Sequence, residues 1–477
     1  MPTTNRILSS GRAALAAAVP PVALGPLDGR YQPVVAPLVD HLSEAALNRN
    51  RVHVEVEWFL HLTDHAVLPG LAPLDDEQKA GLRAVVTDFD TDSVAELAEI
   101  EAVTVHDVKA VEYYIGRRLP ALGLEHLVPL VHFGCTSEDI NNLAWALGVK
   151  DATTDVWLPA ARELVADVEK LARSAAETPM LSRTHGQPAT PTTLGKEMAV
   201  VAHRLGRQIA RIERTEYLGK INGATGTYAA HYASVPDVDW TEVSRRFVEG
   251  LGLTWNPLTT QIESHDWQAE LYADVARFNR ILHNFCTDVW SYISIGYFHQ
   301  IPVEGATGSS TMPHKVNPIR FENAEANLEL SNALLDTLAA TLVTSRWQRD
   351  LTDSSSQRNI GVAFGHSLLA VSNVSKGLSR LDVAEDVLAA DLDENWEVLA
   401  EAIQMVMRAE AIAGVEGMDN PYERLKDLTR GRRVDSARLK EFVAGLGLSP
   451  EAERRLSELT PATYTGIAAQ LVNYLAY

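Results

Sequence analysis

Residues 266–298 read DWQAELYADVARFNRILHNFCTDVWSYISIGYF, and this stretch decides the class of fold. Its apolar side chains recur at spacings of three and four residues, the period of one face of an α-helix. The repeat is formed by Leu271, Val275, Phe278, Leu282, Phe285, Val289 and Ile293. A helix of this length is seldom stable alone and usually packs against other long helices. The stretch therefore predicts one member of a helical bundle.

Four further long stretches repeat the helical spacing, and shorter helical patterns lie on both sides of them. The long stretches are 156–176, 192–217, 321–342 and 359–381. No alternating strand pattern, GxGxxG motif or P-loop is present, which argues against a nucleotide-cofactor fold. We therefore expect an all-α chain of three helical domains, at 1–125, 126–380 and 381–477. The central domain is predicted to be a five-helix bundle whose exposed apolar stripes favour an oligomer.

Composition limits the possible partners of the chain. Its 477 residues include 42 Lys and Arg against 63 Asp and Glu, a net charge of −21. That balance disfavours nucleic-acid binding, and an anionic substrate would need a local cluster of basic side chains. No apolar run is long enough to span a membrane.

The two cysteines and the N-terminal segment bear on location. Cys135 and Cys286 form no CxxC pattern, which fits free thiols in a reducing compartment. Residues 1–27 lack acidic side chains and carry Arg6 and Arg12, so they resemble a weak targeting segment. Their apolar run is short and ends at two prolines, so we expect a flexible tail on a cytoplasmic protein.

The loop at residues 305–318, GATGSSTMPHKVNP, holds the densest set of reactive groups in the chain. Glycines at its start leave the backbone free, whereas Pro313 and Pro318 prevent a helix from running through it. Its hydroxyls, imidazole, ammonium and carboxamide can transfer protons and hold an anion. The sequence therefore predicts a functional loop, although no GxSxG motif marks Ser309 as a hydrolase nucleophile.

Four other polar segments interrupt the helical repeat. They are Asp28 to Tyr31 (DGRY), His106-Asp107, residues 136–142 (TSEDINN) and residues 182–192 (SRTHGQPATPT). Thr136 or Ser137 could simply cap a helix, with acidic side chains in its first turn. His185 cannot lie inside a helix, because glycine and prolines follow it, and taken alone it could be structural or catalytic.

Two further groups of side chains also have more than one interpretation. Arg346, Arg349 and Arg358 surround acidic and hydroxyl side chains, and could either grip an anion or form a surface ion-pair network. Glu57, His61 and His65 share one helical face at metal-ligand spacing, but no further strong ligand group accompanies them. We expect no metal there and no cofactor elsewhere.

The segment from Gly308 to Pro318, GSSTMPHKVNP, resembles the signature loop of the fumarase/aspartase superfamily. The superfamily comprises all-helical homotetramers that eliminate fumarate, or a close relative, from a substituted succinate. Within it, residues 136–142, 184–191 and 349–354, together with His314, are most similar to the enzymes that cleave adenylosuccinate. The resemblance runs from Asp28 to near the C-terminus.

This resemblance implies a nucleotide substrate, sites shared between subunits and a role for each matching residue. Ser309 would be the general base and His185 the general acid. The nucleotide and its phosphate would be held by Arg30, Tyr31, His106, Asp107, Arg349, Ser354 and Arg358. The succinyl part would be held by Thr136, Ser137, Gln261, Lys315 and Asn317. Val105 stands where a polar residue is common in these enzymes, so it carries no implied contact.

Two alternatives remain open on the sequence alone. One is another fumarate-releasing lyase of the superfamily, such as an argininosuccinate lyase. The other is a helical scaffold that kept the fold without the chemistry; the presence of both Ser309 and His185 with their neighbours argues against it.

Overall fold

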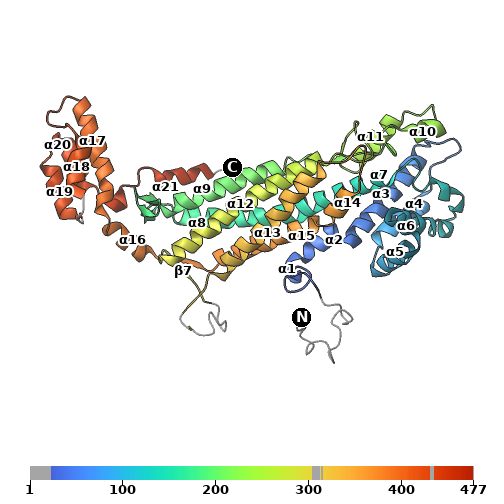
Figure 1. Ribbon diagram of the computed structural model, residues 1–477, viewed down its shortest axis with the longest axis horizontal. Coiled ribbons are helices and arrows are strands. Elements are labelled where there is room, and N and C mark those ends of the chain that lie inside the picture. Colours follow the sequence, from blue (N-terminus) through green and yellow to red (C-terminus); the bar gives the residue numbers. More distant parts are fainter. Residues whose placement is uncertain (1–22, 303–311, 313–314, 430–433, 476–477) are drawn as a thin grey trace, which may run out of the picture. The chain divides into compact units, whose positions relative to one another are not determined.

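The computed structural model describes residues 23–302, 312, 315–429 and 434–475, and helices make up most of that chain (Figure 1). Ser309 lies outside the described residues, as do most of the predicted functional loop and residues 1–22 of the tail. Close contacts divide the chain into two compact units. Unit 1 contains residues 1–160, 211–279 and 327–370, and unit 2 contains residues 161–210, 280–326 and 371–477. The three-domain division expected from the sequence stays a prediction.

The five long helices expected from the apolar spacing are confirmed. They are α8 (Leu158–Ser174), α9 (Leu194–Ile212), α12 (Asp266–Ser294), α13 (Ile319–Leu342) and α15 (Ile360–Leu378). Six of the seven residues of the repeat in α12 are no more than 1% exposed, and the seventh, Ile293, is half-buried. The sequence missed that α8 continues α7 (Ser137–Asp151) through a π-helical stretch, η6 (Ala152–Trp157).

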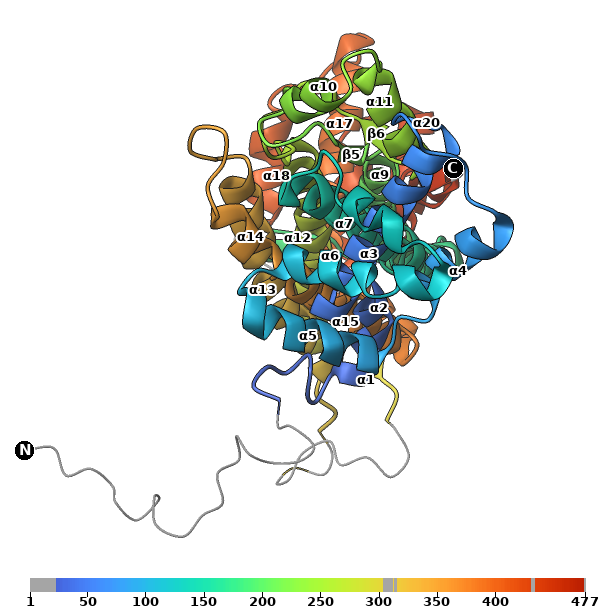
Figure 2. The same ribbon diagram turned by 90° about the vertical axis from the view of Figure 1, so that its right-hand side faces the viewer.

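The remaining helices of unit 1 come from the N-terminal part of the chain and from residues 229–250 and 352–357. They are α1 (Gln32–Val35), η3 (Ala36–Leu38), α2 (Val39–Leu42), α3 (Glu44–Asp64), α4 (Asp76–Thr87), α5 (Thr91–Thr104), α6 (Asp107–Gly116), η4 (Leu119–Leu122), η5 (Glu125–Leu130), α10 (Ala229–Ser234), α11 (Trp240–Gly250) and α14 (Thr352–Gln357). Helices α3 and α7 lie side by side in both views (Figure 1 and Figure 2). Their pairing matters because α7 begins at the predicted substrate residues.

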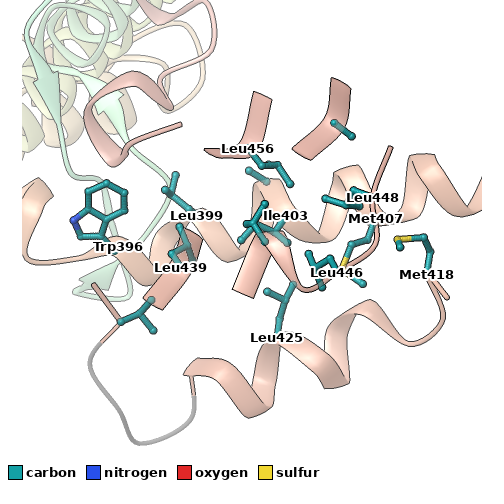
Figure 3. Close-up of a cluster of buried hydrophobic side chains, with 14 residues drawn as sticks. Trp396, Leu399, Ile403, Met407, Met418, Leu425, Leu439, Leu446, Leu448 and Leu456 are labelled. Carbon is teal, nitrogen blue, oxygen red and sulfur yellow. The ribbon is translucent and has the colours of Figure 1, made fainter. Parts of the chain in front are cut away.

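The C-terminal helices of unit 2 have a hydrophobic cluster of their own. They are α16 (Glu385–Asp393), η7 (Trp396–Leu399), α17 (Ala400–Ile412), α18 (Pro421–Thr429), α19 (Ser436–Ala444), α20 (Pro450–Glu458), η8 (Pro461–Thr463), α21 (Ala468–Leu471) and η9 (Val472–Leu475). Figure 3 shows Ile403 and Met407 of α17 among leucines of the neighbouring segments. Burial of such side chains, each contributing roughly 1.5–3 kcal/mol, stabilises this group of helices.

Strands are few and short, so the all-α expectation holds in its coarse form. Among the described residues they form four two-stranded ladders. The pairs are β1 (Pro179–Met180) with β4 (Thr192–Thr193), β2 (Arg183–Thr184) with β3 (Gln187–Pro188), β5 (Leu218–Gly219) with β6 (Thr254–Trp255), and β7 (Phe298–Gln300) with β8 (Leu381–Val383). Only the β5–β6 pair is parallel.

Candidate active site

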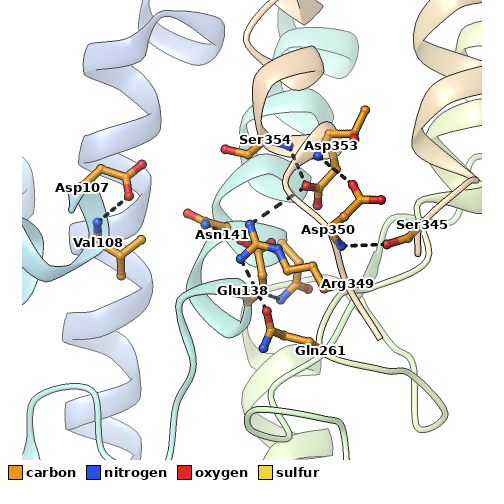
Figure 4. Close-up of polar contacts among 12 residues, drawn as sticks. Asp107, Val108, Glu138, Asn141, Gln261, Ser345, Arg349, Asp350, Asp353 and Ser354 are labelled. Atoms are coloured by element: carbon orange, nitrogen blue, oxygen red, sulfur yellow. Dashed lines mark hydrogen bonds and ion pairs between the residues drawn. The ribbon is translucent and has the colours of Figure 1, made fainter. Parts of the chain in front are cut away.

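Arg349 and Glu138 form the centre of a polar cluster in unit 1 (Figure 4). Nη2 of Arg349 lies 2.8 Å from Oε1 of Glu138, whose side chain is only 4% exposed. Nη1 of Arg349 donates to Oε1 of Gln261 at 3.4 Å, and Gln261 in turn donates to the carbonyl of Ala224. The predicted residues Arg349 and Gln261 are therefore brought together.

Glu138 is a residue that sequence reasoning missed, since it was taken only as an acid in the first turn of a helix. Burial raises the pKa of its carboxyl, and the charge of Arg349 and a hydrogen bond from Asn141 oppose that rise. A buried carboxylate needs such partners to remain ionised. Arg349 thus holds a buried counter-ion, while its Nε has no hydrogen-bond partner among the described residues.

A second ion-pair group in unit 1 joins Arg358, Ser354 and Asp107. Nη2 of Arg358 lies 3.3 Å from Oδ2 of Asp107, and its Nη1 donates to the carbonyl and to Oγ of Ser354, at 2.8 and 2.9 Å. Arg358 also lies 3.3 Å from Glu44. Ser354 and Arg358 come from α14 and the residue that follows it, whereas Asp107 begins α6, so the fold brings the predicted Asp107 to the other two.

Two buried side chains that the sequence did not single out connect these groups. Arg51 of α3 is 1% exposed; its Nη2 lies 2.7 Å from Asp107 and its Nε donates to Oδ1 of Asn141 at 2.9 Å. Asn141 donates in turn to Glu138 at 2.7 Å. Arg349 and Arg358, which are both partly exposed, are therefore linked by a continuous path of contacts through Glu138, Asn141, Arg51 and Asp107. Hydrogen bonds that involve a charged group are stronger than neutral ones.

The N-terminus of α7, which carries Thr136 and Ser137, is fixed by a fully buried ion pair. Asp139 and Lys220 lie 2.8 Å apart with both side chains 0% exposed. Asp139 also accepts the backbone N–H groups of Thr136, Asn222 and Gly223, at 2.8, 2.9 and 3.0 Å. The helix-cap interpretation is thus confirmed for Thr136, which is the N-cap residue of α7, with Glu138 and Asp139 in the first turn. The bonds of Asp139 place Thr136 beside the segment that leads to Ala224, the residue that Gln261 contacts.

The remaining predicted residues of unit 1 lie outside these two groups. The guanidinium of Arg30 lies over the ring of Tyr31, 5.8 Å from its centroid, and Tyr31 packs on the small cluster of Leu27, Val35 and Leu369. His106 is the N-cap of α6, where its Nδ1 accepts the N–H of Lys109 at 3.1 Å. Arg346 is 78% exposed and pairs with Asp350 at 3.3 Å, so for this arginine the surface ion-pair alternative applies.

His185 of unit 2 occupies the tip of the β2–β3 hairpin. It is exposed and has a φ of 53°, in the left-handed region, followed by Gly186 at 73°. Lys315 is exposed, and its N–H donates to the carbonyl of Met312 at 3.1 Å. Asn317 is half-buried. The predicted pairing of His185 with Ser309 stays a prediction, because Ser309 lies outside the described residues.

Neither the metal interpretation nor a cavity identifies a different site. Within the described ranges, no three His, Cys, Asp or Glu side chains could hold a metal ion. Glu57 is bound instead to Arg83 at 2.8 Å, and Nε2 of His61 lies 3.1 Å from the carbonyl of Val243. A cavity of about 810 Å³ lies among α5, α6 and η5, and none of the predicted site residues lines it. The clusters of polar and charged side chains therefore locate the candidate site better than this cavity does.

The helices and cysteines agree with the expectations from composition. None of the helices in the described part of the chain combines the length and the apolar content that crossing a membrane requires. Cys135 and Cys286 are both free, and burial raises the pKa of each thiol. The thiols are therefore protonated and unreactive near neutral pH.

Two family models match the chain. The model described as "Lyase" matches residues 29–331, and the model described as "Adenylosuccinate lyase C-terminal" matches residues 345–465. Curated proteins named adenylosuccinate lyase are similar along nearly the whole length. The protein of Escherichia coli (strain K12) is 50% identical over 454 residues, covering 95% of this chain and 98% of that one. The protein of Haemophilus influenzae is 48% identical, with the same coverage.

Solved structures show the same fold at lower identity. A fumarate lyase from Mesorhizobium sp. BNC1 is 20% identical, with a TM-score of 0.74 and coverage of 92% of this chain and 97% of that chain. A 3-carboxy-cis,cis-muconate lactonizing enzyme from Pseudomonas putida is 23% identical, with a TM-score of 0.71 and coverage of 92% and 96%.

Proposed function

Because the chain belongs to the adenylosuccinate lyase family, we propose that it cleaves adenylosuccinate to AMP and fumarate, and SAICAR to AICAR and fumarate. The observation that carries the proposal is the similarity at 50% identity over 95% of the chain, which includes the family-specific C-terminal region. Both reactions are β-eliminations that break a carbon–nitrogen bond, and both belong to purine nucleotide biosynthesis.

The two arginine groups of unit 1 support an anionic nucleotide as the substrate. Arg349 and Arg358 each keep part of their side chain exposed, at 21% and 37%, while a carboxylate holds the other side. A guanidinium can bind phosphate or carboxylate with two parallel hydrogen bonds. We assign the phosphate and nucleotide to these arginines with Ser354, Asp107, His106, Arg30 and Tyr31.

Thr136, Ser137 and Gln261 are assigned to the succinyl part of the substrate. The contacts of Asp139 with Lys220 and the segment after it support this assignment, because they hold the start of α7 against the chain that Gln261 contacts. Hydroxyl and carboxamide groups can donate to a carboxylate without adding charge to the site.

The mechanism follows from the charge that the reaction develops. Removing a proton from the carbon next to a carboxylate builds negative charge on that carboxylate, which Lys315 and Asn317 would stabilise. Ser309 would take the proton, and His185 would protonate the departing nitrogen. A serine hydroxyl becomes a competent base only in a dry site with positive charge nearby, so closure of the glycine-rich loop is part of the proposal.

The proposal includes a homotetramer in the cytoplasm, with each site built from more than one chain. Large apolar side chains stay exposed on the long helices of a single chain: Val200 on α9, Trp290 on α12, Leu330 on α13 and Val362 on α15, at 44%, 44%, 53% and 39%. Neighbouring subunits would cover such side chains. Two free cysteines support a reducing compartment.

The decisive experiment measures fumarate release from adenylosuccinate, with SAICAR and argininosuccinate as parallel substrates. We expect release from the first two. Release from argininosuccinate alone would favour the other superfamily activity. A chain that releases fumarate from none of them, and whose unfolding temperature does not change with AMP and fumarate, would be a scaffold.

A further inference from the structure

The hairpin that carries His185 is too small to hold its own shape. It has two residue pairs, Arg183 with Pro188 and Thr184 with Gln187, joined by the turn His185–Gly186. One further backbone bond, from the N–H of Ala189 to the carbonyl of Ser182, lies at its base. An isolated two-stranded hairpin is at best marginally stable in water, even when it is much longer than this. The position of His185 must therefore be fixed by contacts from outside the hairpin.

The turn itself adds to this requirement. Both of its central residues have left-handed backbone, with φ of 53° and 73°, as a type I′ hairpin turn demands. Glycine adopts that region freely, whereas a histidine there is unfavourable and persists only where its surroundings enforce it. Without such support, His185 would relax to other backbone conformations and its ring would move.

Arg183, at the first position of the hairpin, makes contacts that can supply this support. Its Nη1 donates to Oη of Tyr297 at 2.6 Å, and its Nη2 donates to Oδ2 of Asp391 at 2.6 Å. The hydroxyl of Tyr297 donates to the same oxygen of Asp391. Arg183, Tyr297 and Asp391 are therefore joined pairwise by hydrogen bonds, and these three residues are called the hub below. Tyr297 lies between α12 and β7, and Asp391 lies in α16, so the hub ties the hairpin to two separate parts of unit 2.

The surroundings keep the Tyr297 hydroxyl and the Arg183 guanidinium each in one protonation state. Tyr297 is only 2% exposed, and burial, followed by its bond to Asp391, raises its pKa to about 12. Burial alone would lower the pKa of Arg183, but the hydrogen bonds with Asp391 and Tyr297 raise it overall. Near neutral pH the hydroxyl therefore keeps its proton and the guanidinium its charge. Bonds to a charged group of this kind are the stronger ones in proteins.

We propose that Arg183, Tyr297 and Asp391 are positioning residues that hold the His185 hairpin in the geometry for proton transfer. This inference rests on the proposed role of His185 as the general acid. The three residues do not bind the substrate; they fix the base of the hairpin, and thereby the direction of the imidazole. A displacement of about 1 Å at a reacting group can lower turnover roughly 10²-fold.

The test uses Tyr297→Phe and Asp391→Asn, which change little besides one hydroxyl and one charge. We expect each to lower kcat by about 10- to 100-fold while KM stays within about threefold, since substrate contacts are untouched. Arg183→Lys should retain more turnover than Arg183→Met. Tyr292→Phe is the matched control, because its ring stacks on Tyr297 at 5.9 Å but lies outside the hub; it should keep the wild-type kcat.

Hydrogen exchange supplies the readout that a general loss of stability would not give. In Tyr297→Phe and Asp391→Asn, amides of residues 182–189 should exchange faster while those of α3 and α7 keep their protection. Unchanged kcat, or faster exchange throughout the chain, would overturn the positioning role. His185→Ala is measured alongside: if it keeps wild-type turnover, the acid assignment fails, whereas if only the hub variants keep it, the positioning inference alone fails.

Discussion

Among the residues that the structure describes, Val105 is the one β-branched residue with left-handed backbone. It ends α5 with a φ of 52°, in the left-handed region, and it is 87% exposed. A β-branched side chain is strained there, by roughly 1–2 kcal/mol, whereas asparagine is tolerated. We expect Val105→Asn to stabilise unit 1 by about 1 kcal/mol and to raise the thermal midpoint by about 1–2 °C at fixed protein concentration.

The control for this substitution is Val103→Asn. Val103 is 84% exposed but lies inside α5, where asparagine forms helix less readily than several other residues. This variant should gain no stability. An equal rise in both midpoints would show that added surface polarity, and not relief of backbone strain, is responsible.

Single residues also show where sequence reasoning stops. Arg349 and Arg358 could be selected from the sequence because their side chains occur beside acids and serines in an irregular segment. Arg51 could not, because it lies within an ordinary helical repeat and its partners Asp107 and Asn141 are 56 and 90 residues away. The buried Lys220 is hidden in the same way, since its partner Asp139 is 81 residues away. Pairing across such separations depends on the fold and leaves no local signal.

At the level of elements, periodicity predicted the long helices and failed at their interruptions. The apolar repeat located α12 and α15 because one face of each must be buried. It does not show where the shorter helices near the C-terminus break: α16 ends at Asp393, and Glu394 and Asn395 separate it from η7. The short β2–β3 ladder was also missed, because two residue pairs give no alternating pattern to detect. Breaks of this kind depend on local hydrogen bonds, which apolar spacing does not record.

The contact between α3 and α11 leads to a prediction about pH. His61 of α3 lies 3.1 Å from the carbonyl of Val243, and burial, followed by the charge of His65, lowers its pKa to about 4 from 6.5. The folded chain thus favours the neutral ring. The stability that this provides is complete above about pH 6.5 and is lost as the pH falls towards 4.

We therefore expect the thermal midpoint of the wild type to fall between pH 7.5 and pH 5 more steeply than that of His61→Gln, whose amide can still donate to Val243. His126→Gln serves as the control, because the side chain of His126 is exposed, and it should follow the wild type. Parallel pH profiles for the wild type and His61→Gln would mean that His61 does not contribute to acid sensitivity.

For the whole molecule, the distribution of the predicted residues over the chain is the central fact. The residues assigned to the phosphate and nucleotide belong to unit 1, as do Thr136, Ser137 and Gln261 of the succinyl set, whereas His185, Lys315 and Asn317 belong to unit 2. The long helix α12 contributes residues to both units. The proposed shared sites would combine the unit 1 residues of one chain with the unit 2 residues of another chain of the oligomer.

Shared sites can be tested by mixing inactive variants. Ser309→Ala and His185→Ala should each lower turnover by about 10²- to 10⁴-fold, the usual contribution of a general base or acid. If the base and the acid of one site come from different chains, a mixed oligomer contains some sites in which both residues are intact. Random exchange at equal amounts would restore up to about a quarter of the wild-type sites in a closed symmetric assembly.

The mixing experiment needs proof that subunits exchange. One variant carries a tag, and native mass measurement follows the formation of mixed oligomers while adenylosuccinate cleavage is recorded over the same period. Activity should rise in step with the mixed species and stay absent when two samples of the same variant are combined. Mixed oligomers that form without any recovery would show that the base and the acid of each site belong to one chain, because each mixed assembly would then contain only defective sites.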